Sequence, residues 1–273
     1  MTPDSLTAVL GPDPLAVVLC ALLLANLAGG AAIAAVALAR LPARRLIGPT
    51  AAYDLWLIPP LTAAATPIVV LVSHANSPVA PIALGLPAPV ITAIWALGAM
   101  GLGSVFVVAQ MRFMREVRAG RAGPAVVGLI APRIVLPAET ADYTAGEREL
   151  IRAHEREHVA RKDPRAAAFA ALCQCLCWFN PLVHLAAYLL RLDQELACDA
   201  AVIRSRPHAR ALYGQTLLKT QLATQPLPFG CYWPARGLHP LEVRIRLLKP
   251  RRGAATRSEG HAVVTAQVES IRP

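Results

Sequence analysis

Long apolar segments separated by short polar ones make up the first 111 residues of the chain. Residues 14–39 contain no formal charge, and no Asp, Glu, Lys or Arg occurs from Leu55 to Met111. A Pro-rich polar interruption at residues 74–89 divides the second of these stretches. Because about 20 apolar residues cross the hydrocarbon core of a bilayer, the pattern predicts three transmembrane helices, at about residues 14–39, 55–73 and 89–110.

Basic residues flank the predicted spans on one side of the membrane. Three arginines lie between spans one and two, and four follow the third span: Arg40, Arg44, Arg45, Arg112, Arg115, Arg118 and Arg121. The N-terminal segment and the loop at residues 74–89 contain no Lys or Arg. By the positive-inside rule, we expect a multi-pass protein of the inner (plasma) membrane. Its N-terminus is expected outside, and the chain after Gln110 in the cytoplasm.

Composition and charge divide the chain in the same way. Hydrophobic residues make up 55% of the chain and charged residues only 16%, against roughly 25% charged residues in ordinary soluble domains. The net charge of +10 lies entirely after residue 111. With only 5% aromatic residues to stack on bases, we expect these basic side chains to face the anionic lipid bilayer and expect no direct nucleic-acid binding. The expected domains are a membrane domain, a cytoplasmic domain and a flexible polar tail, at residues 1–111, 112–248 and 249–273.

A helix with a metal-site motif is predicted in the second half. Thr144 and Glu147 have the spacing of a capping box and open a helix that runs to about Arg161. Within this helix, His154-Glu155-Arg156-Glu157-His158 has the H-E-x-x-H pattern. Residues four apart share a helix face, so both imidazoles can bind one zinc ion. Zinc lowers the pKa of a bound water to about 7, and Glu155 can accept its proton as the general base of peptide hydrolysis.

A third protein ligand is expected further along the chain, because a catalytic zinc usually has three. The candidates are His184, His208, His239, His261, Asp163, Asp193, Glu195 and Asp199. A helix beginning at Asn180-Pro181 would place five polar residues along one stripe, namely His184, Tyr188, Arg191, Glu195 and Asp199. Glu195 as a ligand, with Asp199 bonded to a histidine, is chemically coherent. Solvent-facing charges at a helix end fit the spacing equally well.

Two residues on the same stripe are candidates for a role in catalysis. His184 and Tyr188 could polarise the scissile carbonyl. The segment before and around them is apolar at residues 166–178 and 182–190, which suggests a fourth span. If His158 and Glu195 bind one ion, however, both must lie on the same side of the membrane. A single crossing of the membrane between them is then excluded. The break at Phe179-Asn180-Pro181 therefore favours a helical hairpin that is packed or shallowly inserted in the membrane.

Three smaller features have structural interpretations. Strands predicted at residues 126–130 and 133–136 could bind an extended substrate by strand addition, and packing explains them equally well. Asp163 precedes a proline and is expected to be the N-cap of the next helix, rather than a partner of a metal ligand. Three cysteines do not converge on one helix face, so we expect them to fill space in the core: Cys173, Cys175 and Cys177.

These segments together resemble the BlaR/MecR-type antirepressor metallopeptidases, the zinc-peptidase part of bacterial beta-lactam sensor-transducers. The resemblance covers the three leading spans and the segments Trp56-Leu-Ile-Pro59, Gly128–Pro137, His154–His158, Arg161–Asp163, Trp178–Leu182 and Glu195–Asp199. It implies that His154, His158 and Glu195 bind Zn²⁺ and that Glu155 is the catalytic acid and base. The implied fold class is an α-helical membrane domain plus an α+β zincin-like (gluzincin) cytoplasmic peptidase domain.

The resemblance also implies a function. Such a zinc metalloendopeptidase responds to an extracellular signal, cleaves itself and relieves repression by a BlaI/MecI-like DNA-binding repressor. Full-length sensors continue with a fourth span and an extracellular penicillin-binding domain. Residues after Leu248 contain no uncharged stretch approaching about 18 residues, so we do not expect beta-lactam sensing to carry over.

Two other functions are compatible with the sequence. One is a non-catalytic membrane signalling or scaffold protein with a structural zinc site. The other is a membrane quality-control or prenyl-protein peptidase, which shares the H-E-x-x-H helix. The intact Glu155 favours catalysis, because a structural zinc site has no use for that carboxylate.

Overall fold

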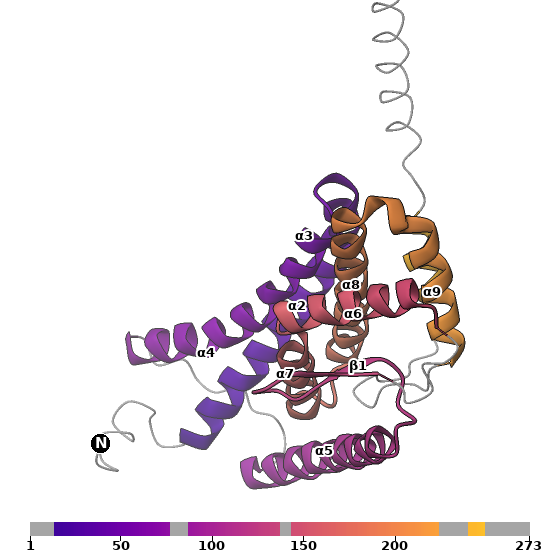
Figure 1. The fold of residues 1–273 in the computed structure, drawn as a ribbon. Helices are drawn as coiled ribbons and strands as arrows, with labels where there is room; N and C mark the ends of the chain where they lie inside the picture. The colour runs from indigo at the N-terminus through magenta and orange to yellow at the C-terminus, as the bar shows by residue number, and fades with distance from the viewer. Residues whose placement is uncertain (1–13, 77–86, 137–142, 224–239, 249–273) are drawn as a thin grey trace, which may run out of the picture.

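The computed structural model describes residues 14–76, 87–136, 143–223 and 240–248. Figure 1 shows a mainly helical molecule whose elements are α2 (Pro14–Leu46), α3 (Pro49–Asp54), η1 (Leu55–Leu57), α4 (Ile58–Asn76), α5 (Ala88–Arg118), β1 (Ala125–Val127), β2 (Arg133–Val135), α6 (Ala145–Ala160), α7 (Asp163–Leu176), α8 (Pro181–Ser205), η3 (Pro207–Ala209), α9 (Arg210–Ala223) and α10 (Pro240–Leu248). The expected tail at residues 249–273 lies outside the described residues.

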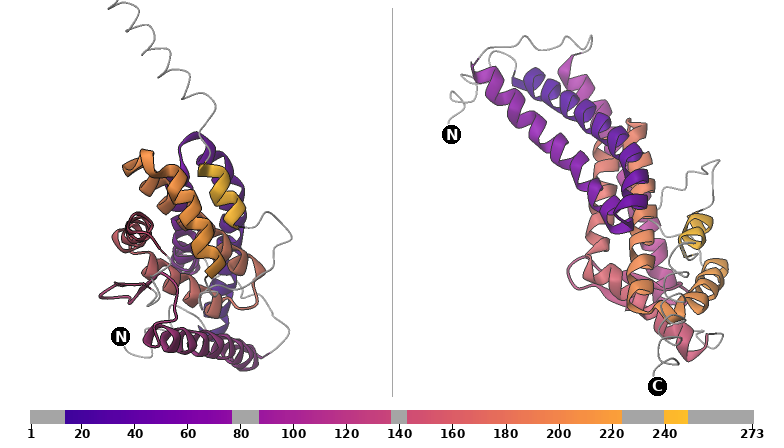
Figure 2. Two further views of the ribbon diagram at one scale, coloured as in Figure 1. Left: turned by 45° about the vertical axis from the view of Figure 1, so that its right-hand side comes forward. Right: turned by 90° about the horizontal axis from the view of Figure 1, so that it is seen from above.

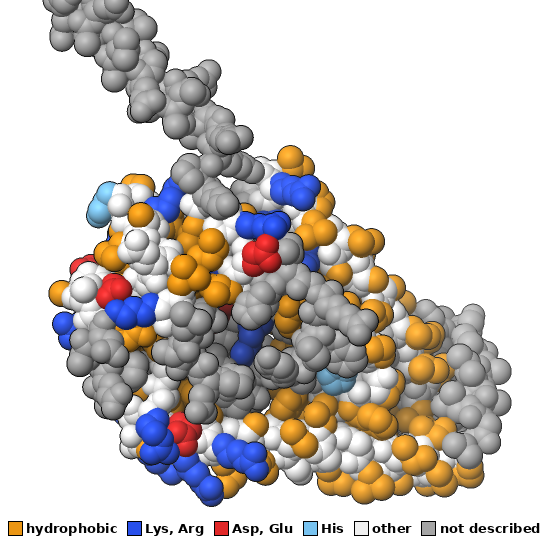
Figure 3. Space-filling model, turned by 90° about the vertical axis from the view of Figure 1, so that its right-hand side faces the viewer, with side chains coloured by type: hydrophobic (Ala, Val, Ile, Leu, Met, Phe, Trp, Pro, Cys, Tyr) orange, Lys and Arg blue, Asp and Glu red, His pale blue; other side chains and the backbone are white. Residues whose placement is uncertain are grey.

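Three helical stretches of the described chain are long and apolar enough to cross a membrane: Val17–Leu46, Pro49–Val70 and Pro89–Arg118. They match the three apolar segments of the sequence, but the helices extend beyond the uncharged residues. α2 continues to Leu46, and α5 continues from the apolar stretch to Arg118 without interruption. Figure 3 shows the matching surface: hydrophobic side chains cover much of one half of the visible face, whereas most of the visible charged side chains lie on the other half.

The apolar helices and α8 pack as one unit. α2 and α4 lie side by side (Figure 2), and α8 packs against α2. A Cβ added to Gly29 of α2 would lie 3.2 Å from the Cβ of Ala63 in α4, so glycine allows this close approach. Ile33, Val36 and Trp56 form a buried cluster against the apolar residues of α8. The helix that carries Glu195 is therefore attached directly to the first apolar helix.

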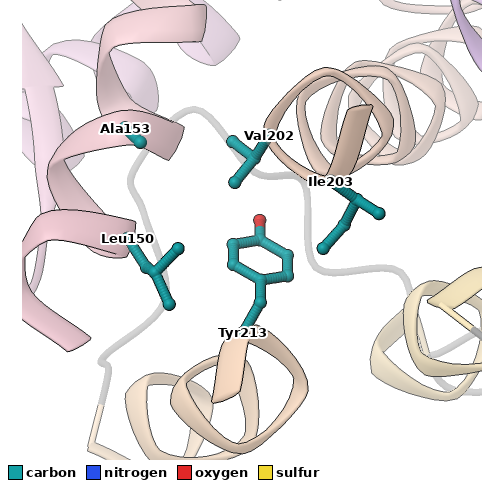
Figure 4. Close-up of a cluster of buried hydrophobic side chains, with 5 residues drawn as sticks. All are labelled: Leu150, Ala153, Val202, Ile203 and Tyr213. Atoms are coloured by element: carbon teal, nitrogen blue, oxygen red, sulfur yellow. The ribbon is translucent and has the colours of Figure 1, made fainter. Parts of the chain in front are cut away.

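A second core holds α6, α8 and α9 together (Figure 4). Leu150 and Ala153 of α6 face Val202 and Ile203 of α8, and the ring of Tyr213 from α9 fills the space between them. Burial of large apolar side chains contributes roughly 1.5–3 kcal/mol each. This core fixes α6 against α8, which are the helices that carry the predicted metal ligands.

The predicted strands are present but short. β1 and β2 pair in antiparallel register, with Val126 opposite Ile134. In the turn between them, Gly128 has φ +107, and a Cβ there would lie 2.7 Å from the carbonyl oxygen of Ala131, so this turn requires glycine. Within the described ranges this pair is the whole sheet, and the α+β zincin-like architecture stays a prediction.

α7 and α8 form the helical hairpin that was expected. The side chain of Asn180 accepts a hydrogen bond from the backbone N–H of Leu182 at 2.9 Å, which confirms the predicted cap of α8. α7 packs against α5, and α8 packs against α2. Cys173 and Cys175 lie in α7 and Cys177 is its C-cap residue; all three are partly buried.

Candidate metal centre

α6 positions the H-E-x-x-H motif. The side chain of Thr144 accepts a hydrogen bond from the backbone N–H of Glu147 at 3.2 Å, and the carboxylate of Glu147 accepts one from the backbone N–H of Thr144 at 2.7 Å. The predicted capping box is therefore confirmed. One face of α6 packs into the core, which leaves His154 and Glu155 buried at the same level of the helix.

Three donor groups converge at this point. The Nε2 atoms of His154 and His158 lie 3.1 Å apart. From α8, the carboxylate of Glu195 places one oxygen 3.3 Å from Nε2 of His154 and the other 3.7 Å from Nε2 of His158. Ligands about 2.1 Å from a tetrahedral zinc ion lie roughly 3.4 Å from one another. The spacing and the chemistry of this donor set therefore fit a zinc ion.

The opposite nitrogen of each imidazole has a partner of its own. Nδ1 of His158 lies 2.7 Å from the carboxylate of Asp163. Nδ1 of His154 lies 2.8 Å from the hydroxyl of Tyr213, which donates to Asp199 at 2.6 Å. A hydrogen bond on Nδ1 orients the ring and leaves Nε2 free to bind a metal. Asp199, which was expected to pair with a histidine, is linked to His154 through the hydroxyl of Tyr213.

Asp163 corrects one expectation. The N-cap of α7 is Lys162, which has a left-handed conformation with φ 59, and Asp163 is the first helical residue. The N-cap prediction was wrong because this tight turn brings the Asp163 carboxylate back under His158. Asp163 also accepts a hydrogen bond from the hydroxyl of Tyr53 at 3.1 Å. Its hydrogen bond with His158 helps to hold the pKa of Asp163 below its ordinary value although burial raises it.

Arg244 of α10 is a site residue that sequence reasoning missed. Its guanidinium donates two hydrogen bonds to Asp199, each 2.8 Å long, and a third nitrogen lies 2.9 Å from the carboxylate of Glu195. Burial raises the pKa of Glu195, but the charge of Arg244 and the two histidines outweigh it and hold the pKa well below the ordinary value. Glu195 therefore carries a negative charge, as a metal ligand requires.

Glu155 faces a cavity of about 690 Å³ beside the donor set. Burial raises the pKa of the Glu155 carboxyl above the usual glutamate value, which suits a general base that works near neutral pH. The cavity is lined by β1, by the predicted candidate Tyr188 and by the end of α5, including Gln110, Phe113 and Met114. The third apolar helix therefore forms part of the wall of the cavity.

The remaining candidate ligands lie elsewhere or outside the described residues. Nε2 of His184 lies 2.9 Å from the carbonyl oxygen of Trp178, and His184 is not among the residues lining the cavity. Asp193 lies on the opposite face of α8 from Glu195, where it binds Arg40. His208 lies in η3 and belongs to neither potential metal group. His239 and His261 lie outside the described residues.

Cys198 lies close to the site without completing the donor set. It is fully buried, and its sulfur lies 3.4 Å from Nδ1 of His158 and 3.7 Å from the carboxylate of Asp163. These three residues form a second group with the spacing of metal ligands. Burial raises the pKa of the Cys198 thiol, and Nδ1 of His158 is already bonded to Asp163. The protonated thiol therefore acts as a packed neighbour of that hydrogen bond.

A bundle of apolar helices joined to a His-His-Glu donor set with an adjacent glutamate is typical of membrane-bound metallopeptidases. Residues 116–248 match the model of the family described as BlaR1 peptidase M56. This match covers just under half of the chain and, with the curated relatives, supports its similarity to the BlaR/MecR-type metallopeptidases. The family resemblance inferred from the sequence is thereby confirmed.

Individual relatives are similar over part of the chain. "Regulatory protein BlaR1" of Bacillus licheniformis is 32% identical over 115 residues, which is 40% of this chain and 19% of that protein. "Methicillin resistance mecR1 protein" of Staphylococcus aureus and of Staphylococcus epidermidis is 29% identical over 102 residues, which is 36% of this chain and 17% of each relative. The match thus spans less than a fifth of the length of these relatives. No solved structure shows significant similarity.

Proposed function

We propose that the protein is a zinc-dependent endopeptidase anchored by three membrane spans, and that it cleaves itself and a BlaI/MecI-like repressor in response to a signal. One observation carries the proposal: the Nε2 atoms of His154 and His158 and the carboxylate of Glu195 lie within 4.8 Å of one another at a cavity that Glu155 also lines. A structural zinc site would need no glutamate at that position.

Each residue has a defined role in the proposed hydrolysis. His154, His158 and Glu195 would hold the ion, which supplies a Lewis acid and a water of lowered pKa. Glu155 accepts a proton from the water that attacks the peptide carbonyl, and then passes this proton to the leaving amine as the C–N bond breaks. Asp163 and Tyr213 hold the two imidazoles in the orientation that presents Nε2 to the ion.

The proposed topology follows from the basic residues. Arg40 and Arg44 at the end of α2 and the arginines at the end of α5 are assigned to the cytoplasmic side by the positive-inside rule. The N-terminus is then outside, and the site lies in the cytoplasm, where a DNA-binding repressor is accessible. Support comes from the cavity wall, which includes residues at the end of α5.

The test is metal-dependent proteolysis by the purified protein. The zinc-loaded protein in lipid vesicles is incubated alone and with a BlaI/MecI-like repressor, and fragments are identified by mass spectrometry. We expect cleavage of at least one of the two that a chelator abolishes and added Zn²⁺ restores. If neither protein is cut under any metal condition, the peptidase assignment fails.

A further inference from the structure

The first half of α8, one arm of the α7–α8 hairpin, packs along the first apolar helix, α2. At the hairpin turn, the amide of Asn180 donates a hydrogen bond to the side chain of Asn26 in α2 at 2.8 Å. At the other end of the contact, Asp193 binds Arg40 of α2. Asp193 comes thirteen residues after Asn180 along α8, a rise of about 20 Å. The first half of α8 therefore lies parallel to the apolar part of α2 over about two thirds of a hydrocarbon core roughly 30 Å thick.

The end of α7 and the turn after it are hydrogen-bonded to α5. The indole N–H of Trp95 donates to the carbonyl oxygen of Leu176 at 2.7 Å, and the indole N–H of Trp178 donates to the carbonyl oxygen of Trp95 at 3.2 Å. A Cβ added to Gly98 would lie 2.1 Å from the Trp178 ring, so this ring lies directly on the helix backbone. The hairpin turn is thus held between α2 and α5 at the level of their apolar segments.

Polar groups inside the hairpin are paired with one another. Residues 166–190 contain no Asp, Glu, Lys or Arg. The amide of Gln174 lies 3.2 Å from Nδ1 of His184, whose Nε2 lies 2.9 Å from the carbonyl oxygen of Trp178. Polar side chains and non-helical backbone are tolerated within a bilayer when protein surrounds them and satisfies their hydrogen bonds. The turn of this hairpin meets that condition.

Apolar side chains cover the outward surface of the hairpin. Four large ones on α7 and the turn are between 42% and 53% exposed: Phe169, Leu172, Leu176 and Phe179. A soluble surface rarely gathers large exposed apolar side chains in one place. α7 packs directly against α5, which also carries exposed apolar side chains. Hydrocarbon that surrounds α2 and α5 would therefore also contact the hairpin.

We propose that α7 and the first half of α8 form a re-entrant membrane hairpin, which enters the bilayer from the side of Arg40 and Asp193, turns at residues 177–180 and returns to the same side. This proposal rests on the assignment of α2 and α5 as membrane spans in the proposed function. It replaces the expected shallow insertion by penetration past the middle of the hydrocarbon core. The hairpin brings Glu195 back to the membrane surface, where α6 supplies the two histidines.

Depth measurement by spin labelling tests the hairpin directly. The five cysteines other than Cys198 are replaced by alanine, and Cys198 stays because it is fully buried. Single cysteines at Phe169, Leu172, Leu176 and Phe179 are spin-labelled in vesicles of phosphatidylethanolamine and phosphatidylglycerol, and relaxation by oxygen and by a water-soluble nickel chelate is compared. Exposed Val69 of α4 is the span reference, and Ser205→Cys at the exposed end of α8 is the aqueous reference. Retained zinc content identifies folded variants.

The expected result is a graded loss of nickel accessibility. The ratio of oxygen to nickel relaxation should rise from residue 169 to residue 179, reach the value at residue 69, and exceed the value at residue 205 severalfold. Full nickel accessibility at residues 172–179, or equal shallow depth at all four positions, would overturn the re-entrant hairpin while leaving the proposed function intact. Nickel accessibility at residue 69 would instead overturn the span assignment on which both rest.

Discussion

The hydroxyl of Tyr213 bridges His154 and Asp199, and it determines which nitrogen of His154 faces the cavity. Asp199 is held by Arg244 and accepts the phenol proton at 2.6 Å, so the same oxygen must accept the proton of Nδ1 of His154 at 2.8 Å. Burial raises the pKa of Tyr213 well above its usual value, and the charge of Asp199 raises it further. The phenol therefore stays protonated, and Nε2 of His154 is left as the free donor atom.

Tyr213→Phe should weaken zinc binding without unfolding the site. The phenylalanine ring still fills the core between α6 and α8, but Nδ1 of His154 loses its partner. Loss of a residue that hydrogen-bonds to a metal-binding histidine lowers metal affinity about 10–100-fold. Competition with a chromophoric chelator measures the change. The matched control is Tyr188→Phe, because Tyr188 lines the cavity without bonding to either histidine; equal affinities in the two variants would contradict the role of Tyr213.

Glu155→Gln should keep zinc and lose proteolysis. Glutamine is close in volume but cannot accept the proton of the attacking water, and a positioned general base contributes roughly 10²–10⁴-fold to rate. The fragment assay measures cleavage, and atomic absorption measures zinc. Glu149→Gln is the control on the same helix, since the Glu149 side chain is 65% exposed. Wild-type cleavage by Glu155→Gln would rule out the proposed mechanism.

Glu195→Ala should lose zinc rather than catalysis alone. The variant removes one of the three donors and leaves Arg244 beside the two histidines, where its positive charge opposes a cation. We expect a larger loss of zinc affinity than the roughly 10–100-fold caused by removing a residue that only hydrogen-bonds to a metal ligand. Glu242→Ala, on the exposed side of α10, is the control. If Glu195→Ala retains a full equivalent of tightly bound zinc, a different residue is the third ligand.

Local sequence patterns predicted the parts of the site that depend on one helix. The spacing of Thr144, His154 and His158 within a single helix determines their common geometry, and Asn180-Pro181 determines where α8 begins. Asp193 could also have been excluded as a fellow ligand of Glu195, because residues two apart on a helix point in nearly opposite directions.

Long-range packing decides the rest of the site. Tyr213 and Arg244 reach it from helices whose placement depends on the core around Val202 and on the packing of α10. No local pattern marks either residue as functional. Asp163 was misassigned because its role depends on the left-handed conformation of Lys162, which a non-glycine residue adopts infrequently. Short-range spacing therefore predicted the candidate ligands, and tertiary contacts supplied the residues that orient them.

The capping box of α6 should make stability depend on pH. The hydrogen bond from the Thr144 backbone outweighs burial and lowers the pKa of Glu147 in the folded protein. A lowered folded pKa gives a stabilising contribution that is complete above the unfolded value of 4.5 and is lost as pH falls through the folded pKa. Glu147→Gln should therefore be less stable than wild type at pH 7, and this difference should shrink below pH 4.5. Unfolding followed by circular dichroism in detergent tests this; a constant difference would contradict it.

Asp193 should contribute more to stability than any surface ion pair. Its fully buried carboxylate lies 3.1 Å from a guanidinium nitrogen of Arg40 and 2.9 Å from the indole nitrogen of Trp56, and it also binds Arg44. Removing one member of a buried ion pair costs about 3–5 kcal/mol, because the remaining charge stays buried without its partner. Asp193→Ala should therefore lower the unfolding temperature strongly.

Two comparisons separate the charge of Asp193 from its hydrogen bonds and from general surface effects. Asp193→Asn keeps an acceptor for the indole N–H of Trp56 but loses the negative charge, so its unfolding temperature should lie between those of wild type and Asp193→Ala. Glu242→Ala breaks the exposed pair with Arg246, and exposed pairs contribute only about 0–1 kcal/mol. If Asp193→Ala unfolds at the same temperature as Glu242→Ala in detergent micelles, the contacts of Asp193 with Arg40 and Arg44 do not join α2 to α8. We expect Asp193→Ala to have the lowest unfolding temperature of these variants, because the Asp193–Arg40 contact holds the first apolar helix against the helix that carries Glu195.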